Sequence, residues 1–158
     1  MKTLIVYFSK FGNTRRLAEA MAEAFKQAGE ARVIGIDQLA VSDLDGIDLV
    51  VMGSPTHAFS VPKAVRTALE SLPLAILSAK SVAAFDTTVT VWPLRHWRAS
   101  PKLLAHLARL GGTPVAKPRT FSVRTSNPQK TGEIDLLLDG ELERARDWAS
   151  TLCGQSKT

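Results

Sequence analysis

Short apolar segments rich in β-branched residues alternate with longer segments of helical period along this chain. Residues 3–8 (TLIVYF) form an unbroken apolar run of strand length, which predicts a strand buried on both faces, as in a parallel sheet. Residues 13–29 follow with helical period, with Leu17, Met21 and Phe25 on one face and Gly29 at the end. This alternation predicts an α/β fold with helices on both faces of a parallel sheet.

The rest of the chain continues the alternation. We expect further strands at 32–36, 49–54, 81–86 and 120–123, helices at 61–72, from the Ser100–Pro101 pair to Leu110 and from an Asp139 cap to Leu152, and irregular chain over 87–98 and 124–133. These elements make a three-layer αβα sandwich around a five-stranded parallel sheet. The 158 residues fit one domain, residues 1–158. Ligands of such sheets bind beyond the carboxyl ends of the strands, here loops 9–14, 55–61 and 86–98.

Charge and cysteine content restrict the partners. The 20 basic and 15 acidic residues leave a net charge of +5, which favours anionic partners. The basic residues are spread along the chain without a recognition motif, so we expect no nucleic-acid partner.

No apolar run approaches the roughly 18 residues of a membrane span, so we expect no membrane insertion. The single Cys153 excludes an internal disulfide and favours a reducing cytoplasm, and no His, Asp and Glu cluster has the spacing of metal ligands.

The first loop concentrates groups that bind an anion. Ser9-Lys10-Phe11-Gly12-Asn13-Thr14 places two hydroxyls, an amide and backbone N–H groups at a helix N-terminus. Capping of the helix by Ser9 or Asn13 alone is the competing interpretation. The loop is neither a Walker A motif nor a G-x-G-x-x-G fingerprint. Asp37 follows the second strand, where dinucleotide-binding folds have an acidic residue that binds the ribose. Because the first loop has only one glycine, we expect Asp37 to be a helix-cap or loop residue instead.

Four segments in order resemble the flavodoxin family, specifically its short-chain FMN-binding members. S-x-x-G-N-T at 9–14 resembles the phosphate loop, Gly53–Phe59 (GSPTHAF) the second flavin loop, and Phe85-Asp86-Thr87 the start of the third. The segment from Gly140 to Ala149 is similar to the last helix. The resemblance covers essentially the whole chain and implies the flavodoxin-like strand order 2-1-3-4-5.

The resemblance also implies a cofactor, FMN, and the residues that hold it. The 5′-phosphate would lie on Ser9, Lys10, Phe11, Gly12, Asn13 and Thr14. One side of the flavin ring would face Pro55, Thr56, His57, Ala58 and Phe59, and the other Asp86, Thr87, Thr88 and Trp92. Which aromatic stacks is open, since Phe59 and His57 compete on one side and Trp92 and Trp97 on the other.

Two departures from the family pattern stand out. No glycine lies between Ser54 and Val61, whereas many flavodoxins have one whose peptide contacts the one-electron-reduced flavin. The resemblance therefore implies weaker stabilisation of that form. Familiar carriers are acidic, but this chain is basic, and Arg95, His96, Arg98 and Lys102 gather around the third loop. They form either a solvated rim or a landing patch for an acidic redox protein.

Three functions fit these patterns to different degrees. An FMN electron carrier between redox-partner proteins, a monomer or weak dimer, ranks first because the loops contain no evident catalytic residues. The alternative is an FMN-dependent oxidoreductase of the quinone-reductase or protoporphyrinogen-oxidising type, in which His57 could transfer a proton. A regulatory module without FMN ranks last, since the acidic pair that response-regulator receiver domains need after the first strand is missing here.

Overall fold

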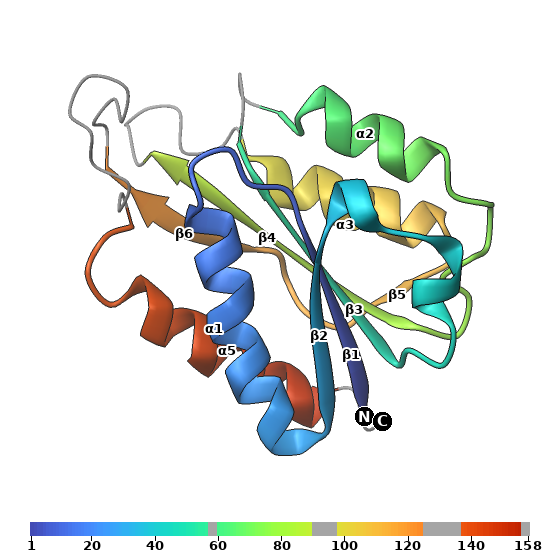
Figure 1. The fold of residues 1–158 in the computed structure, drawn as a ribbon, viewed down its shortest axis with the longest axis horizontal. Coiled ribbons are helices and arrows are strands. Elements are labelled where there is room, and N and C mark those ends of the chain that lie inside the picture. The colour runs from blue at the N-terminus through green and yellow to red at the C-terminus, as the bar shows by residue number, and fades with distance from the viewer. Residues whose placement is uncertain (57–59, 90–97, 125–136, 156–158) are drawn as a thin grey trace.

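A computed structural model describes residues 1–56, 60–89, 98–124 and 137–155 (Figure 1). The strands are β1 (Lys2–Tyr7), β2 (Glu30–Gly35), β3 (Leu49–Pro55), β4 (Ser81–Val89), β5 (Thr113–Pro114) and β6 (Arg119–Val123). The helices are α1 (Asn13–Ala28), α2 (Lys63–Glu70), α3 (Ala99–Arg109) and α5 (Glu141–Gln155), with short 3-10 turns η1 (Ile36–Gln38) and η2 (Val41–Leu44). No helix in these ranges is long and apolar enough to cross a membrane.

The strands pair in the order β2-β1-β3-β4-β5, and every pairing between them is parallel, which confirms the expected fold class. The last position of the sheet is shared by two segments. β5 pairs with the beginning of β4, and β6, the expected fifth strand, pairs with its end. Pro114 and Pro118 flank the break between them. Proline has no N–H to donate to a strand ladder, which accounts for the interruption.

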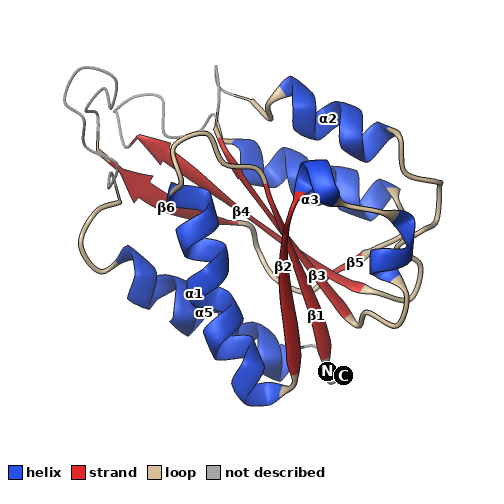
Figure 2. Cartoon of the chain, in the orientation of Figure 1, coloured by secondary structure: helices blue, strands red, loops and turns tan. Residues whose placement is uncertain are grey.

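Two apolar cores lie on opposite faces of the sheet. Figure 2 shows the helices arranged on the two sides of the sheet. Leu4 and Val6 of β1 belong to the core beneath α2 and α3, whereas Ile5 belongs to the core beneath α1 and α5. Each of these three side chains is fully buried. The unbroken apolar run that predicted a strand buried on both faces therefore packs as expected, because successive strand residues point to opposite faces.

Several element boundaries differ from the sequence prediction. β4 continues to Val89 instead of ending at Asp86, since residues 87–89 pair with β6; the expectation of irregular chain was wrong for these residues. α2 begins after Pro62 and ends at Glu70, inside the predicted 61–72. α3 has Arg98 rather than Ser100 as its N-cap, because the backbone N–H of Ser100 bonds to Asp86.

The crossover from β2 to β3 contains no α-helix. Only η1 and η2 connect the two strands, in agreement with the sequence prediction, which places strands at 32–36 and 49–54 and no helix between them. α5 makes its first helical bond from the Arg144 N–H to the Gly140 carbonyl, and it continues past the predicted end to Gln155. Gly140 has φ +80°, a conformation that favours glycine, so the helix begins after this turn rather than at Asp139.

Candidate functional site

The three expected ligand loops leave the sheet at adjacent positions. Tyr7, Gly53 and Phe85 stand in one row across β1, β3 and β4. The first loop therefore starts near the carboxyl ends of the other two strands, which continue to Pro55 in β3 and to Val89 in β4. The N–H of Phe8 donates to the Gly53 carbonyl (2.9 Å), which ties the start of the first loop to β3. This edge, at the top of Figure 1, is where a doubly wound sheet binds its ligand.

Gly12 shapes the first loop. It has φ +90°, it is the N-cap of α1, and a Cβ added to it would have nothing within 4 Å. Its N–H donates to Ser9 Oγ (3.0 Å), so the hydroxyl hydrogen of Ser9 stays available for another acceptor. Gly12 provides no side-chain cap, and the first turn of α1 contains no acidic residue. A helix start of this kind presents backbone donors and the positive end of the helix dipole to an anion.

A buried pair of hydroxyls connects the first loop with the third. Thr14 Oγ1 lies 3.2 Å from Thr87 Oγ1, and both residues are buried. One hydroxyl of such a pair donates to the other, and the acceptor keeps its own hydrogen for a further partner. The start of α1 and the end of β4 are thus held together through groups that can still donate to an anion.

Thr56 and Asp86 connect the second loop with the third. The Thr56 N–H donates to the Thr87 carbonyl (2.9 Å), and Thr56 Oγ1 accepts the Ala99 N–H (2.9 Å). Asp86 is fully buried, and its Oδ2 accepts the Ser100 N–H at 2.7 Å and the Thr56 hydroxyl at 3.4 Å. The carboxylate thereby caps α3 from a neighbouring strand. Its Oδ1 is buried without a hydrogen-bond partner in the described part of the chain.

The expected site residues fall into four groups. Asn13, Thr14, Asp86 and Thr87 are buried at the edge, and Ser9, Gly12, Pro55, Thr56 and Thr88 are partly exposed around it. Lys10 and Phe11 are exposed, with Lys10 Nζ 5.2 Å from the centre of the Phe11 ring. His57, Ala58, Phe59 and Trp92 lie outside the described residues, as do Arg95, His96 and Trp97.

Sequence reasoning missed the part played by Ser100. The Ser-Pro pair at 100–101 suggested that Ser100 caps its own helix, whereas its N–H bonds to Asp86. No local signal marks this contact, because the two residues belong to different elements. Among the described residues, no three or more His, Cys, Asp and Glu side chains lie close enough together to hold a metal ion.

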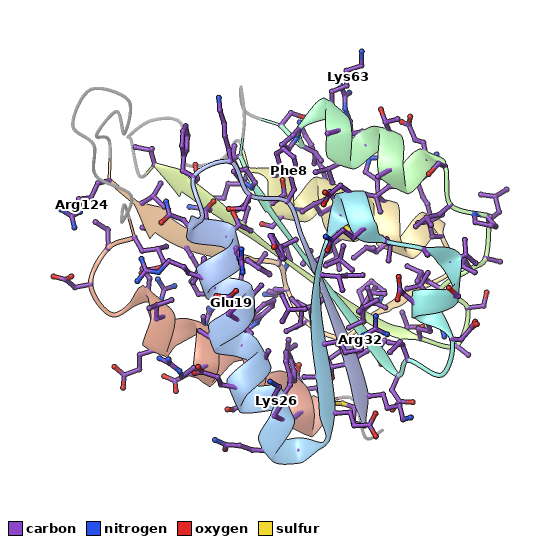
Figure 3. All side chains as sticks on the ribbon, viewed as in Figure 1. Phe8, Glu19, Lys26, Arg32, Lys63 and Arg124 are labelled. Atoms are coloured by element: carbon purple, nitrogen blue, oxygen red, sulfur yellow. The ribbon has the colours of Figure 1, made fainter. Side chains whose placement is uncertain are left out.

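The groups present at this edge fit FMN. A phosphate needs several donors and no facing carboxylate, and the Ser9 hydroxyl, the Thr14–Thr87 pair and the uncapped start of α1 meet that need. The open space over Gly12 lets an anion approach the backbone closely. Lys63 projects outward from the same edge, as Figure 3 shows, and Lys10 adds a second exposed positive charge.

Comparison with known proteins identifies the family. The model of the flavodoxin domain matches residues 4–112, which is more than half of the chain and includes all three loops. The NADPH-dependent diflavin oxidoreductase 1 of Cryptococcus neoformans is 31% identical over 134 residues, covering 80% of this chain and 22% of the relative. The chain thus spans about a fifth of that enzyme.

Solved structures share the fold over nearly the full length. A flavodoxin from the domain Archaea superposes with a TM-score of 0.79 at 18% identity, covering 100% of both chains. Flavodoxin 2 of Bacillus cereus gives 0.75 at 20% identity, also over 100% of both. Rubredoxin oxygen:oxidoreductase of Desulfovibrio gigas gives 0.75 at 20% identity over 99% of this chain and 36% of that one. The chain therefore belongs to the flavodoxin domain family, and that membership supports FMN binding and electron transfer to redox partners.

Proposed function

We propose that this chain holds FMN at the carboxyl edge of its sheet and carries electrons between redox proteins. The observation that carries the proposal is the hydrogen bonding among the three loops. The hydroxyls of Thr14 and Thr87 share a hydrogen bond, and Thr56 donates to the Thr87 carbonyl and to the Asp86 carboxylate. Loops that are joined before a ligand arrives form a preorganised site, which reduces the ordering that binding requires.

The parts of FMN would occupy different loops. The phosphate belongs on residues 9–14, where the donors are. The flavin ring belongs between the second loop, residues 55–59, and the third, with Asp86, Thr87, Thr88 and Trp92. When bound, FMN supplies one- and two-electron chemistry, and the protein's task is to orient it and limit its contact with water. In this assignment Asp86 and Thr56 hold the walls of the site rather than react.

The partner would be a protein with an acidic contact surface. Lys10, Lys63 and Lys102 lie at or near the edge, and the chain as a whole carries a net charge of +5. Opposite charge on a partner accelerates encounter, and salt weakens this effect. We further propose a monomer or weak dimer in a reducing compartment such as the cytoplasm, in keeping with the single Cys153, which forms no disulfide. A match to one fifth of a diflavin enzyme is what a single flavin-holding domain would give.

FMN titration of the flavin-free protein tests the site. Gly12→Asp places a negative charge where the phosphate is expected, and Gly12→Asn is its control, since Asn has the same size and tolerates positive φ equally well. Fluorescence quenching of FMN should show affinity at least tenfold lower for the Asp variant than for the Asn variant, whereas riboflavin, which lacks the phosphate, should bind both alike. Equal FMN affinities of the two variants would place the phosphate elsewhere.

Electron transfer has its own test. Stopped-flow reduction of the FMN-loaded protein by an acidic redox protein should slow as the salt concentration increases from about 0.05 to 0.5 M, because charge screening becomes strong over this range. A rate independent of salt contradicts the acidic-partner assignment. Steady consumption of NADPH or a quinol by the purified protein alone would instead favour the FMN-dependent oxidoreductase of the quinone-reductase or protoporphyrinogen-oxidising type.

A further inference from the structure

A cavity lies beside the first loop, on the side of β2 rather than of β4. Its volume is about 390 Å³, and its walls include Phe8, Ile36, Asp37, Ala64 and Ala68. It opens where the β2–β3 crossover consists only of η1 and η2, so no full helix fills the space between the end of β2 and α2. Small-molecule sites measure roughly 300–1,000 Å³, and this volume suits one nucleoside-sized group. Figure 3 shows Phe8 at the upper end of β1, next to α2.

Asp37 is the carboxylate of this cavity. Its Oδ1 lies over Gly35, so closely that a Cβ at residue 35 would be 2.5 Å from it. Gly35 has φ −70°, which any residue can adopt, and an added Cβ would meet only the flexible end of the exposed Asp37 side chain. Asp37 is exposed at the rim of the cavity, where both carboxylate oxygens can accept hydrogen bonds from a ligand.

The cavity continues into the phosphate loop. Ser9 belongs to both, since it lines the cavity and accepts the Gly12 N–H. In the order β2-β1-β3, β2 and β3 flank β1 on opposite sides. A phosphate on the loop after β1 can therefore extend toward β3 and β4, as assigned to FMN, or toward β2 and Asp37. Dinucleotide-binding folds use the second direction for adenosine, with an acidic residue after β2 on the ribose hydroxyls.

We propose that the cavity binds the ribonucleoside part of a ribonucleotide, with adenine nucleotides as the test case, and that the phosphate of this nucleotide lies on the same loop that holds FMN. The inference rests on the proposed function, because the phosphate loop is shared. Asp37 accepts hydrogen bonds from the ribose hydroxyls, and the base packs on the ring of Phe8 and against Ala64 and Ala68 of α2. Aromatic stacking of a base tolerates different bases, so the ribose contact sets the preference for a ribonucleotide.

The nucleotide has two possible sources with the same chemistry. It can be a separate molecule such as ADP, which would compete with FMN for the loop. It can also be the AMP half of FAD, whose flavin half would occupy the FMN position. The single glycine of the loop, at φ +90°, lets the backbone approach one phosphate closely.

Calorimetric titration of the full-length, FMN-free protein with ADP tests the proposal. We expect binding that weakens once the protein is loaded with FMN. Asp37→Asn should weaken ADP binding about tenfold or more, as loss of a charge-assisted contact does. The wild type should bind 2′-deoxy-ADP more weakly by a similar factor, and the Asp37→Asn protein should not discriminate between the two. Asp45→Asn removes an exposed carboxylate elsewhere and should change nothing.

A second variant tests the cavity independently of Asp37. Ala64→Phe fills the cavity from α2 and should abolish ADP binding, while Ala105→Phe, at an exposed alanine of α3, should not. If Ala64→Phe also weakens FAD but spares FMN, the occupant is the AMP half of FAD, and if it spares both, the occupant is a separate nucleotide. Absence of ADP binding, or binding that neither Asp37→Asn nor Ala64→Phe weakens, overturns the inference. FMN binding in the same preparation shows whether the proposed function survives.

Discussion

Gly53 allows the ring of Phe85 to lie directly against β3, and replacing it with alanine should destabilise the protein strongly. A Cβ at residue 53 would lie 2.1 Å from Cζ of Phe85 and within 2.6 Å of both Cε atoms. The closest ordinary van der Waals contact is about 3.4 Å, so the ring would have to retreat by more than 1 Å (3.4 − 2.1 = 1.3 Å). These contacts are with a stiff ring, not with the flexible end of a side chain.

The surroundings of Phe85 prevent that retreat. The ring is fully buried and meets Phe121 and Trp148 edge-on, with centroids 5.9 and 6.3 Å away. Overpacking in a close-packed core costs about 1–3 kcal/mol and occasionally more. We expect Gly53→Ala to lower the free energy of unfolding by about 3 kcal/mol, and Tm by roughly 6–12 °C for a domain of this size.

Urea unfolding of the FMN-free protein measures this cost. Gly154→Ala is the control, since the same substitution meets nothing within 4 Å in α5 and should stabilise the protein by up to about 1 kcal/mol. Phe85→Leu combined with Gly53→Ala should cost less than the sum of the two single variants, by about 1 kcal/mol or more, because leucine leaves room for the new Cβ. A Gly53→Ala protein within 0.5 kcal/mol of the wild type (about the usual scatter of a neutral substitution) would refute the reasoning.

Three further predictions concern the edge and the crossover. Asp86→Ala should lower the free energy of unfolding, measured in urea, by about 2–4 kcal/mol, because the Ser100 N–H at the start of α3 loses its buried acceptor. A change below about 1 kcal/mol, the cost of losing an ordinary helix cap, would contradict this role. Thr14→Val should cost about 1–2 kcal/mol by leaving the Thr87 hydroxyl unpaired, and Thr87→Val in the same chain should recover part of it. Two contacts lower the pKa of Asp43: the hydrogen bond from the Ala40 N–H has the larger effect, and the hydrogen bond from Arg32 the next. Ionised Asp43 therefore stabilises the folded protein at pH values above the ordinary carboxyl pKa, and this stabilisation is lost as the pH falls through the lowered pKa. NMR titration should therefore show that Arg32→Gln raises the Asp43 pKa only part of the way to its ordinary value.

Local patterns were enough to predict the first half of the fold. The run at residues 3–8 and the stripe of Leu17, Met21 and Phe25 predict β1 and α1 because burial and period are properties of neighbouring residues. The first loop was predictable for the same reason. Its hydroxyls, Gly12 and the start of α1 are consecutive in the chain, and Gly12 does adopt a positive φ.

Contacts between distant segments were not predictable in this way. Thr87 and Thr88 gave no clear strand pattern, and they extend β4 only because β6 pairs with them. β5 is two residues long and exists through its pairing with β4. A charged residue such as aspartate at a ligand-binding edge suggests an exposed side chain. Asp86 is instead fully buried, and its carboxylate accepts hydrogen bonds from Thr56 and Ser100. The cavity beside Asp37 depends on how far α2 lies from η1, which no local pattern encodes.

These long-range contacts determine how the two sides of the edge differ. On the side of β4, the loops are bonded to one another through Thr14, Thr56, Asp86 and Thr87, so a flavin ring would meet walls that are already fixed. On the side of β2, a short crossover leaves a cavity whose lining includes one carboxylate, that of Asp37. The phosphate loop lies between them and can serve either direction. A substitution at Thr56, whose hydroxyl bonds to Asp86 and to the Ala99 N–H, should therefore disturb the flavin side alone. A substitution at Gly12 should weaken the binding of FMN and of the second nucleotide together, and this difference separates the two sites in a single set of variants.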